Sequence, residues 1–116
     1  MEKFYKPNTI AILFNEKLNE SENLANKIKN DISDDFEVFV QSVAVALQNN
    51  LPSNPDLLIS IGGDGTILRC AKVLNGTNCP ILGINMGNLG FLCEIDSSDV
   101  DSKLQKYLSG EAVIET

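Results

Sequence analysis

The sequence predicts an α/β fold with an open, mostly parallel sheet flanked by helices, and three observations support this prediction. Short apolar runs alternate along the chain with segments whose apolar residues recur at helical spacing. The apolar runs are nearly continuous, as in parallel strands that are buried on both faces. Turn-forming residues such as Pro52, Pro55 and Asn75-Gly76 separate them. Such alternation implies parallel strands joined by right-handed crossovers.

The first half of the chain predicts two strands and two helices. Residues 10–14 are all apolar and form the first strand, and residues 15–20 form a polar loop. Ser21 is expected to cap a helix over residues 22–32, whose inner face carries apolar side chains at helical spacing. A second strand over residues 36–40 follows the break at residues 33–35. Residues 42–50 weakly favour a helix.

The second half predicts two strands that each lead directly into a glycine-rich loop. Residues 57–61 form the third strand, and a helix follows its loop as far as Leu74. Residues 80–84 form the fourth strand. A last helix is expected over residues 99–108, with Gly110 just beyond its end, and residues 112–115 indicate one more strand.

Length and charge limit the possible classes of protein. The chain has 116 residues, which is the size of a single domain, and carries 9 Lys and Arg against 16 Asp and Glu, a net charge of −7. The acidity argues against a nucleic-acid-binding protein, which normally has a basic surface. No apolar run approaches the length of a membrane span, and the first residues do not resemble a signal peptide. We therefore expect a cytoplasmic protein without a membrane or nucleic-acid partner.

The absence of histidine excludes several kinds of site. No Ser-His-Asp or Cys-His mechanism is possible within this chain, so a general base must be another side chain, such as a carboxylate. Cys70, Cys79 and Cys93 show no paired spacing of a zinc site, and we expect three reduced thiols in or near the core.

The loop after the third strand, Gly62-Gly63-Asp64-Gly65-Thr66, has the features of a phosphate or nucleotide cradle. Its glycines let backbone N–H groups approach a ligand closely, and it opens a helix whose N-terminus favours anions. A carboxylate in this place suggests a second task, either holding an attacking hydroxyl or holding a metal. The alternative is a tight turn in which Asp64 only caps the helix. The loop matches neither the Walker A motif nor the dinucleotide fingerprint.

The loop after the fourth strand combines amide and apolar side chains. Asn85 and Asn88 can donate and accept hydrogen bonds, while Leu89 and Phe91 can flank a planar ring. The alternative is a simple turn with Phe91 in the core. Ligands of open parallel sheets bind beyond the carboxyl ends of the strands, so both loops should face one crevice. Arg69, on the helix after the first loop, could reach a phosphate or ribose there, or be a solvated surface charge.

The two motifs together resemble the N-terminal domain of NAD kinase, the ATP-NAD kinase family. The first, Gly62-Gly63-Asp64-Gly65-Thr66, is shared with diacylglycerol, sphingosine and 6-phosphofructokinases, to whose fold this domain is related. The second motif comprises residues 82–92, with the sequence LGINMGNLGFL. At this spacing from the first motif it is much more specific for the NAD kinase family. The order of the other elements also fits, so the resemblance covers nearly the whole chain.

The resemblance implies ATP-dependent phosphorylation of the 2′-hydroxyl on the adenosine ribose of NAD, giving NADP, with Mg²⁺ or another divalent metal as cofactor. It implies that Asp64 is the proton acceptor. It also implies that the nucleotide contacts are Gly62, Gly63, Gly65, Thr66, Leu68, Arg69, Asn85, Leu89, Gly90 and Phe91. Some members of the family use polyphosphate as donor, and the full enzyme is expected to form homo-oligomers.

In one respect the sequence departs from the family. The family's full chain is more than twice as long, and its C-terminal β-rich domain carries an Asn-Glu pair that completes the dinucleotide site. The pairs Asn15-Glu16 and Asn19-Glu20 lie in the loop after the first strand, so that role is not assigned to them. We therefore expect residues 1–116 to be a single N-terminal domain, inactive alone. A lipid or sugar kinase relative and a non-catalytic nucleotide-binding module are the alternatives.

Overall fold

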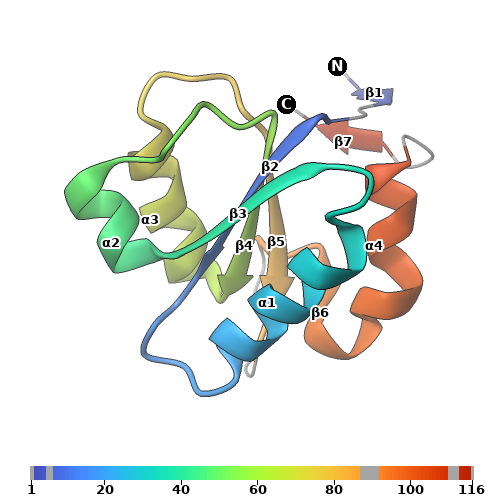
Figure 1. Ribbon diagram of the computed structural model, residues 1–116, viewed down its shortest axis with the longest axis horizontal. Coiled ribbons are helices and arrows are strands. Elements are labelled where there is room, and N and C mark those ends of the chain that lie inside the picture. Colours follow the sequence, from blue (N-terminus) through green and yellow to red (C-terminus); the bar gives the residue numbers. More distant parts are fainter. Residues whose placement is uncertain (1, 5–6, 87–91, 110–112, 116) are drawn as a thin grey trace.

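In the computed structural model, a five-stranded parallel sheet lies between two layers of helices (Figure 1). The structure describes residues 2–4, 7–86, 92–109 and 113–115. The strand order is β3-β2-β4-β5-β6, and every neighbouring pair is parallel. The predicted α/β class and parallel sheet are therefore confirmed.

The elements agree closely with the predicted ones, usually to within two residues. The central strands β2, β4 and β5 are apolar and almost fully buried, which explains why their sequences show no alternation. The bounds of these elements are β2 Thr9–Phe14, α1 Ser21–Ile32, β3 Glu37–Ser42, α2 Val43–Asn49, β4 Leu57–Gly62, α3 Asp64–Leu74, β5 Ile81–Asn85, β6 Ile95–Asp96 and α4 Val100–Leu108.

Each face of the sheet has its own core. The first cluster joins alternate residues of β2, β4 and β5 to the inner faces of α1 and α4, which contribute Ala25, Ile28, Val100 and Leu104 among others. The second joins the opposite faces of β2 and β4 to α2 and α3 through residues such as Ala46 and Cys70. In Figure 1, α2 and α3 accordingly lie to the left of the sheet, and α1 and α4 lie to the right.

The direction in which the chain adds successive strands to the sheet reverses between β2 and β4. The chain passes from β2 to β3 at one edge, crosses back over β2, and continues through β4 and β5 toward the other edge. Ligands of doubly wound sheets bind at such a switch point, beyond the carboxyl ends of the strands. These ends carry Asn15 and Glu16 after β2 and the first glycine-rich loop after β4.

The start of α1 differs from the prediction. Ser21 is not the N-cap, because Glu20 occupies that position with a left-handed backbone, and Ser21 is the first helical residue. The buried Ser21 hydroxyl instead donates to the carbonyl oxygens of Asn15 and Leu18. It therefore stabilises the loop after β2 rather than the free N–H groups of the helix.

Three short strands complete the fold. β6, which follows the second loop, was not predicted because two residues give no pattern. The strand expected at the end of the chain is present as β7 (Val113–Glu115), but it pairs antiparallel with β1 (Glu2–Phe4) in a separate ladder. The expected role of Gly110 lies outside the described residues. Among those residues, no helix is long and apolar enough to cross a membrane.

Candidate functional site

The two glycine-rich loops begin side by side. Gly62, the last residue of β4, is paired in register with Asn85, the last residue of β5. The backbone N–H of Met86 donates to the carbonyl oxygen of Gly62 at 2.8 Å. Both loops therefore start at the same edge of the sheet, as the prediction of one shared crevice requires.

The first turn of α3 is built tightly around Thr66. The Thr66 hydroxyl oxygen lies 3.4 Å from the Gly63 nitrogen and accepts its hydrogen bond. A Cβ atom on Gly62 would lie 2.3 Å from the same oxygen, so only glycine fits there. Thr66 is only 3% exposed, and thus shapes the loop from inside, whereas Gly65 is exposed to solvent.

We expect the Thr66 hydroxyl to contribute modestly to stability. Thr66→Val keeps the shape of the side chain but leaves the Gly63 N–H without this acceptor, and should lower the free energy of unfolding by about 1 kcal/mol. Thr66→Ser keeps the hydroxyl and should lose less. Urea denaturation of both variants measures the difference. A Thr66→Val variant as stable as the wild type, or more stable than Thr66→Ser, would mean that the hydrogen bond does not contribute.

Asp64 is the first residue of α3 and is half-buried at the mouth of the first loop. Its Oδ1 atom accepts a hydrogen bond of 2.9 Å from the backbone N–H of Leu92, 28 residues further along the chain. The contact joins the carboxylate to the segment that follows the second loop. The same oxygen lies 4.0 Å from the sulfur of Cys93.

The Cys93 thiol stays protonated beside this carboxylate. Burial raises the pKa of Cys93, and the negative charge of Asp64 raises it further. Gly83 makes room for this residue, since a Cβ atom at position 83 would lie 3.1 Å from the Cys93 Cα and 2.6 Å from a methyl carbon of Ile67. All three cysteines are free, as predicted, and Cys70 is completely buried.

Arg69 and Leu68 lie one turn further along α3. Nη2 of Arg69 is 3.2 Å from Oε2 of Glu16, in the loop after β2, and both side chains are about one third exposed (32% and 29%). Leu68 is 60% exposed and leaves an apolar surface on α3 beside the loop.

Asn85 is buried rather than open to solvent. It is 6% exposed, and within the described part of the chain its Oδ1 atom has no hydrogen-bond partner. The pKa of the neighbouring Asp96 is lowered, mainly by the hydroxyl and N–H of Ser98 and less by the Asn85 amide. The other predicted contacts of the second loop, Leu89, Gly90 and Phe91, lie outside the described residues.

Sequence reasoning gave no site role to three residues that touch the site, although Leu92 is the last residue of the second motif. Leu92 and Cys93 contact Asp64, and Glu16 pairs with Arg69. The contacts of Asp64 join residues that are far apart in the chain, so no local pattern indicated them. Glu16 could have been found, because it directly follows β2 and the residues after the strands at a switch point form the ligand-binding crevice.

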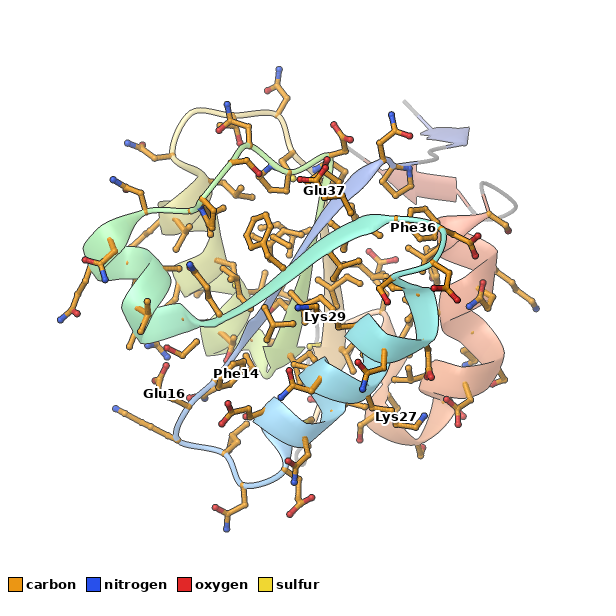
Figure 2. All side chains as sticks on the ribbon, viewed as in Figure 1. Phe14, Glu16, Lys27, Lys29, Phe36 and Glu37 are labelled. Atoms are coloured by element: carbon orange, nitrogen blue, oxygen red, sulfur yellow. The ribbon has the colours of Figure 1, made fainter. Side chains whose placement is uncertain are left out.

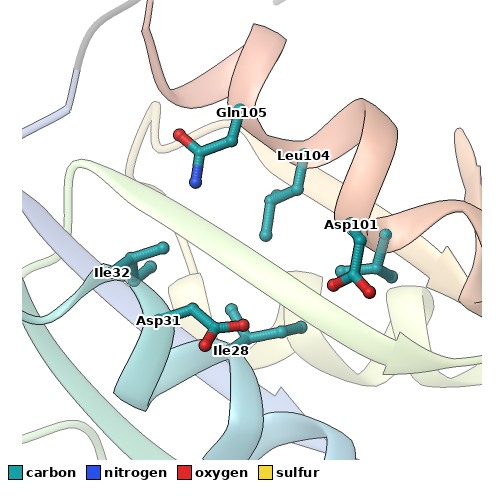
Figure 3. A pocket seen from close by; sticks show the side chains of 7 residues that line it. Ile28, Asp31, Ile32, Asp101, Leu104 and Gln105 are labelled. Carbon is teal, nitrogen blue, oxygen red and sulfur yellow. The ribbon is translucent and has the colours of Figure 1, made fainter.

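The described residues contain no group of three or more His, Cys, Asp or Glu side chains that could hold a metal ion. A cleft of about 170 Å³ lies between α1 and α4 (Figure 3), and its lining includes Ile28 and Asp31 of α1 and Asp101 and Leu104 of α4. Its lining includes no predicted site residue, so it is separate from the glycine-rich loops.

Comparison with known proteins agrees with the motifs. The family described as the ATP-NAD kinase N-terminal domain matches residues 2–112. NAD kinase from Clostridium tetani is 42% identical over 95 residues, which cover 79% of this chain and 35% of that protein. NAD kinase from Clostridium beijerinckii is 41% identical over 105 residues, covering 90% and 33%. The chain thus spans about a third of the length of these curated relatives.

The fold is also similar to that of a solved structure. The crystal structure of yeast NADH kinase complexed with NADH superposes with a TM-score of 0.73 at 20% identity, covering 91% of this chain and 37% of that one. At this level of identity the similarity concerns the fold.

Proposed function

The chain belongs to the ATP-NAD kinase family, and from this premise we propose that it is the N-terminal part of an enzyme that phosphorylates NAD. The reaction would transfer phosphate from ATP to the 2′-hydroxyl of the adenosine ribose and give NADP. The observation that supports this best is the joining of the two loops, in which the Asp64 carboxylate accepts the N–H of Leu92 beside the paired strand ends. This contact would hold one carboxylate where both loops could reach a single ligand.

Asp64 would orient the attacking hydroxyl and accept its proton late in the reaction. A carboxylate is a far weaker base than the alkoxide of a ribose, so complete deprotonation of the hydroxyl before attack is unfavourable. Phosphoryl transfer usually passes through a loose transition state, in which the attacking oxygen needs little negative charge early on. The position of the Asp64 carboxylate therefore matters more than its basicity, and the Leu92 N–H would fix that position through its hydrogen bond to Oδ1.

The nucleotide would lie over the first turn of α3. The backbone of Gly62, Gly63 and Gly65 gives close access to the helix N-terminus, where N–H groups favour phosphate. The exposed side chain of Leu68 would pack against a ring or ribose, and Arg69 would supply positive charge. The buried Asn85 Oδ1 would accept a hydrogen bond from a hydroxyl or amino group, together with contacts from Leu89, Gly90 and Phe91.

A divalent metal would be held mainly by the substrate phosphates, because the described residues contain no group of three or more His, Cys, Asp or Glu side chains that could hold it. Mg²⁺ usually keeps several waters and is bound by only one or two carboxylates together with substrate phosphates, so such a site needs few protein ligands. When bound, the ion neutralises charge on the phosphates of ATP. Polyphosphate in place of ATP would need the same neutralisation.

Activity would require a second, β-rich domain, because the chain spans only about a third of the length of its curated relatives. We expect residues 1–116 alone to bind NAD weakly and to form no NADP above a mock preparation. Calorimetric titration of NAD into this chain and into the full-length enzyme, side by side, measures the contribution of the second domain. NADP formation by the 116-residue chain would contradict this view.

The test of the function is the choice of acceptor. Full-length enzyme is incubated with ATP and one acceptor in each of four reactions, the acceptors being NAD, NADH, diacylglycerol and sphingosine. The phosphorylated product is identified by mass spectrometry. We expect NADP or its reduced form and no phosphorylated lipid. Phosphorylation of a lipid would favour the lipid kinase alternative, and binding of NAD without any turnover would favour a nucleotide-binding module.

A further inference from the structure

Asp64 and Arg69 lie on opposite flanks of α3. The partner of Asp64 is Leu92, which follows β5, whereas the partner of Arg69 is Glu16, which follows β2. In the sheet, β4 lies between these two strands, and α3 begins just beyond its end. The carboxylate and the guanidinium therefore face different sides of one helix N-terminus, and Arg69 is the one at the switch point between β2 and β4.

Glu16 connects three segments at this switch point. Figure 2 shows it just beyond Phe14, where β2 has ended. Its Oε2 atom lies 3.2 Å from Arg69 Nη2 on α3, while its Oε1 atom accepts a 3.0 Å hydrogen bond from the backbone N–H of Ala44, in the first turn of α2. The loop itself is tied to β4, because the N–H of Asn15 donates to the carbonyl oxygen of Ile61 at 3.0 Å.

Because both carboxylate oxygens are used, Glu16 holds Arg69 in one place. Burial alone would raise the pKa of Glu16, but the N–H of Ala44, its own N–H and the Arg69 guanidinium outweigh it and lower the pKa. The carboxylate therefore stays ionised at neutral pH. An arginine side chain has many rotamers, and fixing one of them before a ligand arrives reduces the entropy lost on binding.

We propose that Glu16 is a positioning residue, which holds the Arg69 guanidinium at the switch point so that it contacts the diphosphate of a bound nucleotide from the flank opposite Asp64. The inference rests on the proposed function, since it needs a nucleotide at the first loop. Arg69 has five N–H donors, and the bond through Nη2 leaves others for phosphate. NAD and ATP both carry a diphosphate, and the measurement below distinguishes them.

The test is a double-mutant cycle on the full-length enzyme, with KM for NAD, KM for ATP and kcat as readouts. Glu16→Gln removes the charge and replaces one of the two acceptor oxygens, which now serve Ala44 and Arg69 separately, with an NH₂ group that cannot accept. We expect it to raise one of the two KM values about two- to fivefold, with kcat nearly unchanged. Arg69→Gln should raise the same KM by about tenfold or more. In the Arg69→Gln background, Glu16→Gln should then have no further effect on KM.

Asp101→Asn is the matched control, because it also removes a carboxylate from an ion pair, the 2.7 Å contact with Lys27 between α4 and α1, but lies away from the loops. It should leave both KM values unchanged. Arg69→Lys provides a second variant, which keeps the positive charge but loses the planar set of N–H donors of the guanidinium. The positioning role is overturned if Glu16→Gln leaves both KM values unchanged or lowers one of them. It is also overturned if Glu16→Gln raises KM as much in the Arg69→Gln background as in the wild-type enzyme. Absence of NADP formation by the wild-type enzyme would instead overturn the proposed function.

Discussion

Replacing Asp64 with asparagine should lower the turnover of the full-length enzyme at least ~100-fold, which is the lower end of the range for general acid-base groups. Asparagine has nearly the same shape and can still accept the hydrogen bond from the Leu92 N–H, but it cannot take up the proton of the ribose hydroxyl. The loss should therefore appear in kcat, measured as the steady-state rate of NADP formation, and much less in the affinity for NAD.

Asp31→Asn serves as the control for this experiment. Asp31 is an exposed carboxylate on α1 that pairs with Lys27, so its loss changes the net charge equally without touching the loops. Its turnover should equal that of the wild type. If Asp64→Asn turned over as fast as this control, Asp64 would have no part in proton transfer, and the first loop would be only a binding turn.

Replacing Gly62 with alanine should destabilise the fold by about 1–3 kcal/mol, as expected when a methyl group is forced into a packed site. The added Cβ would lie 2.3 Å from the Thr66 hydroxyl oxygen and 2.9 Å from the Thr66 Cβ. Either α3 or the end of β4 must move to relieve this contact, and the hydrogen bond between Gly62 and Met86 would be strained with it. Urea denaturation of the 116-residue chain measures the loss.

The adjacent glycine provides a matched control. A Cβ atom on Gly63 would meet no atom within 4 Å, and its backbone is extended with φ at −125°, so Gly63→Ala should change stability by less than about 0.5 kcal/mol. Gly62→Ala combined with Thr66→Ala removes the hydroxyl from the contact and should lose less stability than the sum of the two single changes. Simple additivity would show that the clash with Thr66 is not the cause.

The sequence predicted the central strands and the larger helices well, since burial imposes a simple pattern on them. The apolar run of β4 followed by glycines and a helix indicated both the strand and its ligand-binding end, and the apolar spacing along α1 and α4 indicated their inner faces. By contrast, β6 was missed because two residues show no period, and the partner of β7 was missed because antiparallel pairing with β1 leaves no local mark.

Local chemistry also misled at one position. A serine before an apolar helical pattern usually caps the helix, but the Ser21 hydroxyl is buried and hydrogen-bonded to carbonyl oxygens of the preceding loop. The contacts of Asp64 with Leu92 and of Arg69 with Glu16 were not predicted for a related reason, although the place of Glu16 directly after β2 could have indicated Glu16 itself. These contacts depend on which strands are neighbours in the sheet and on the directions in which the side chains of α3 point. Tertiary packing determines both of these factors.

The hydrogen bond between Asp64 and Leu92 gives the protein a built-in spectroscopic probe. A backbone proton held by an ionised carboxylate resonates at a different frequency from one whose acceptor has been neutralised or has turned away. The Leu92 amide signal in a ¹⁵N-correlated NMR spectrum would therefore report changes at Asp64 as substrate is added, without any label at the carboxylate itself.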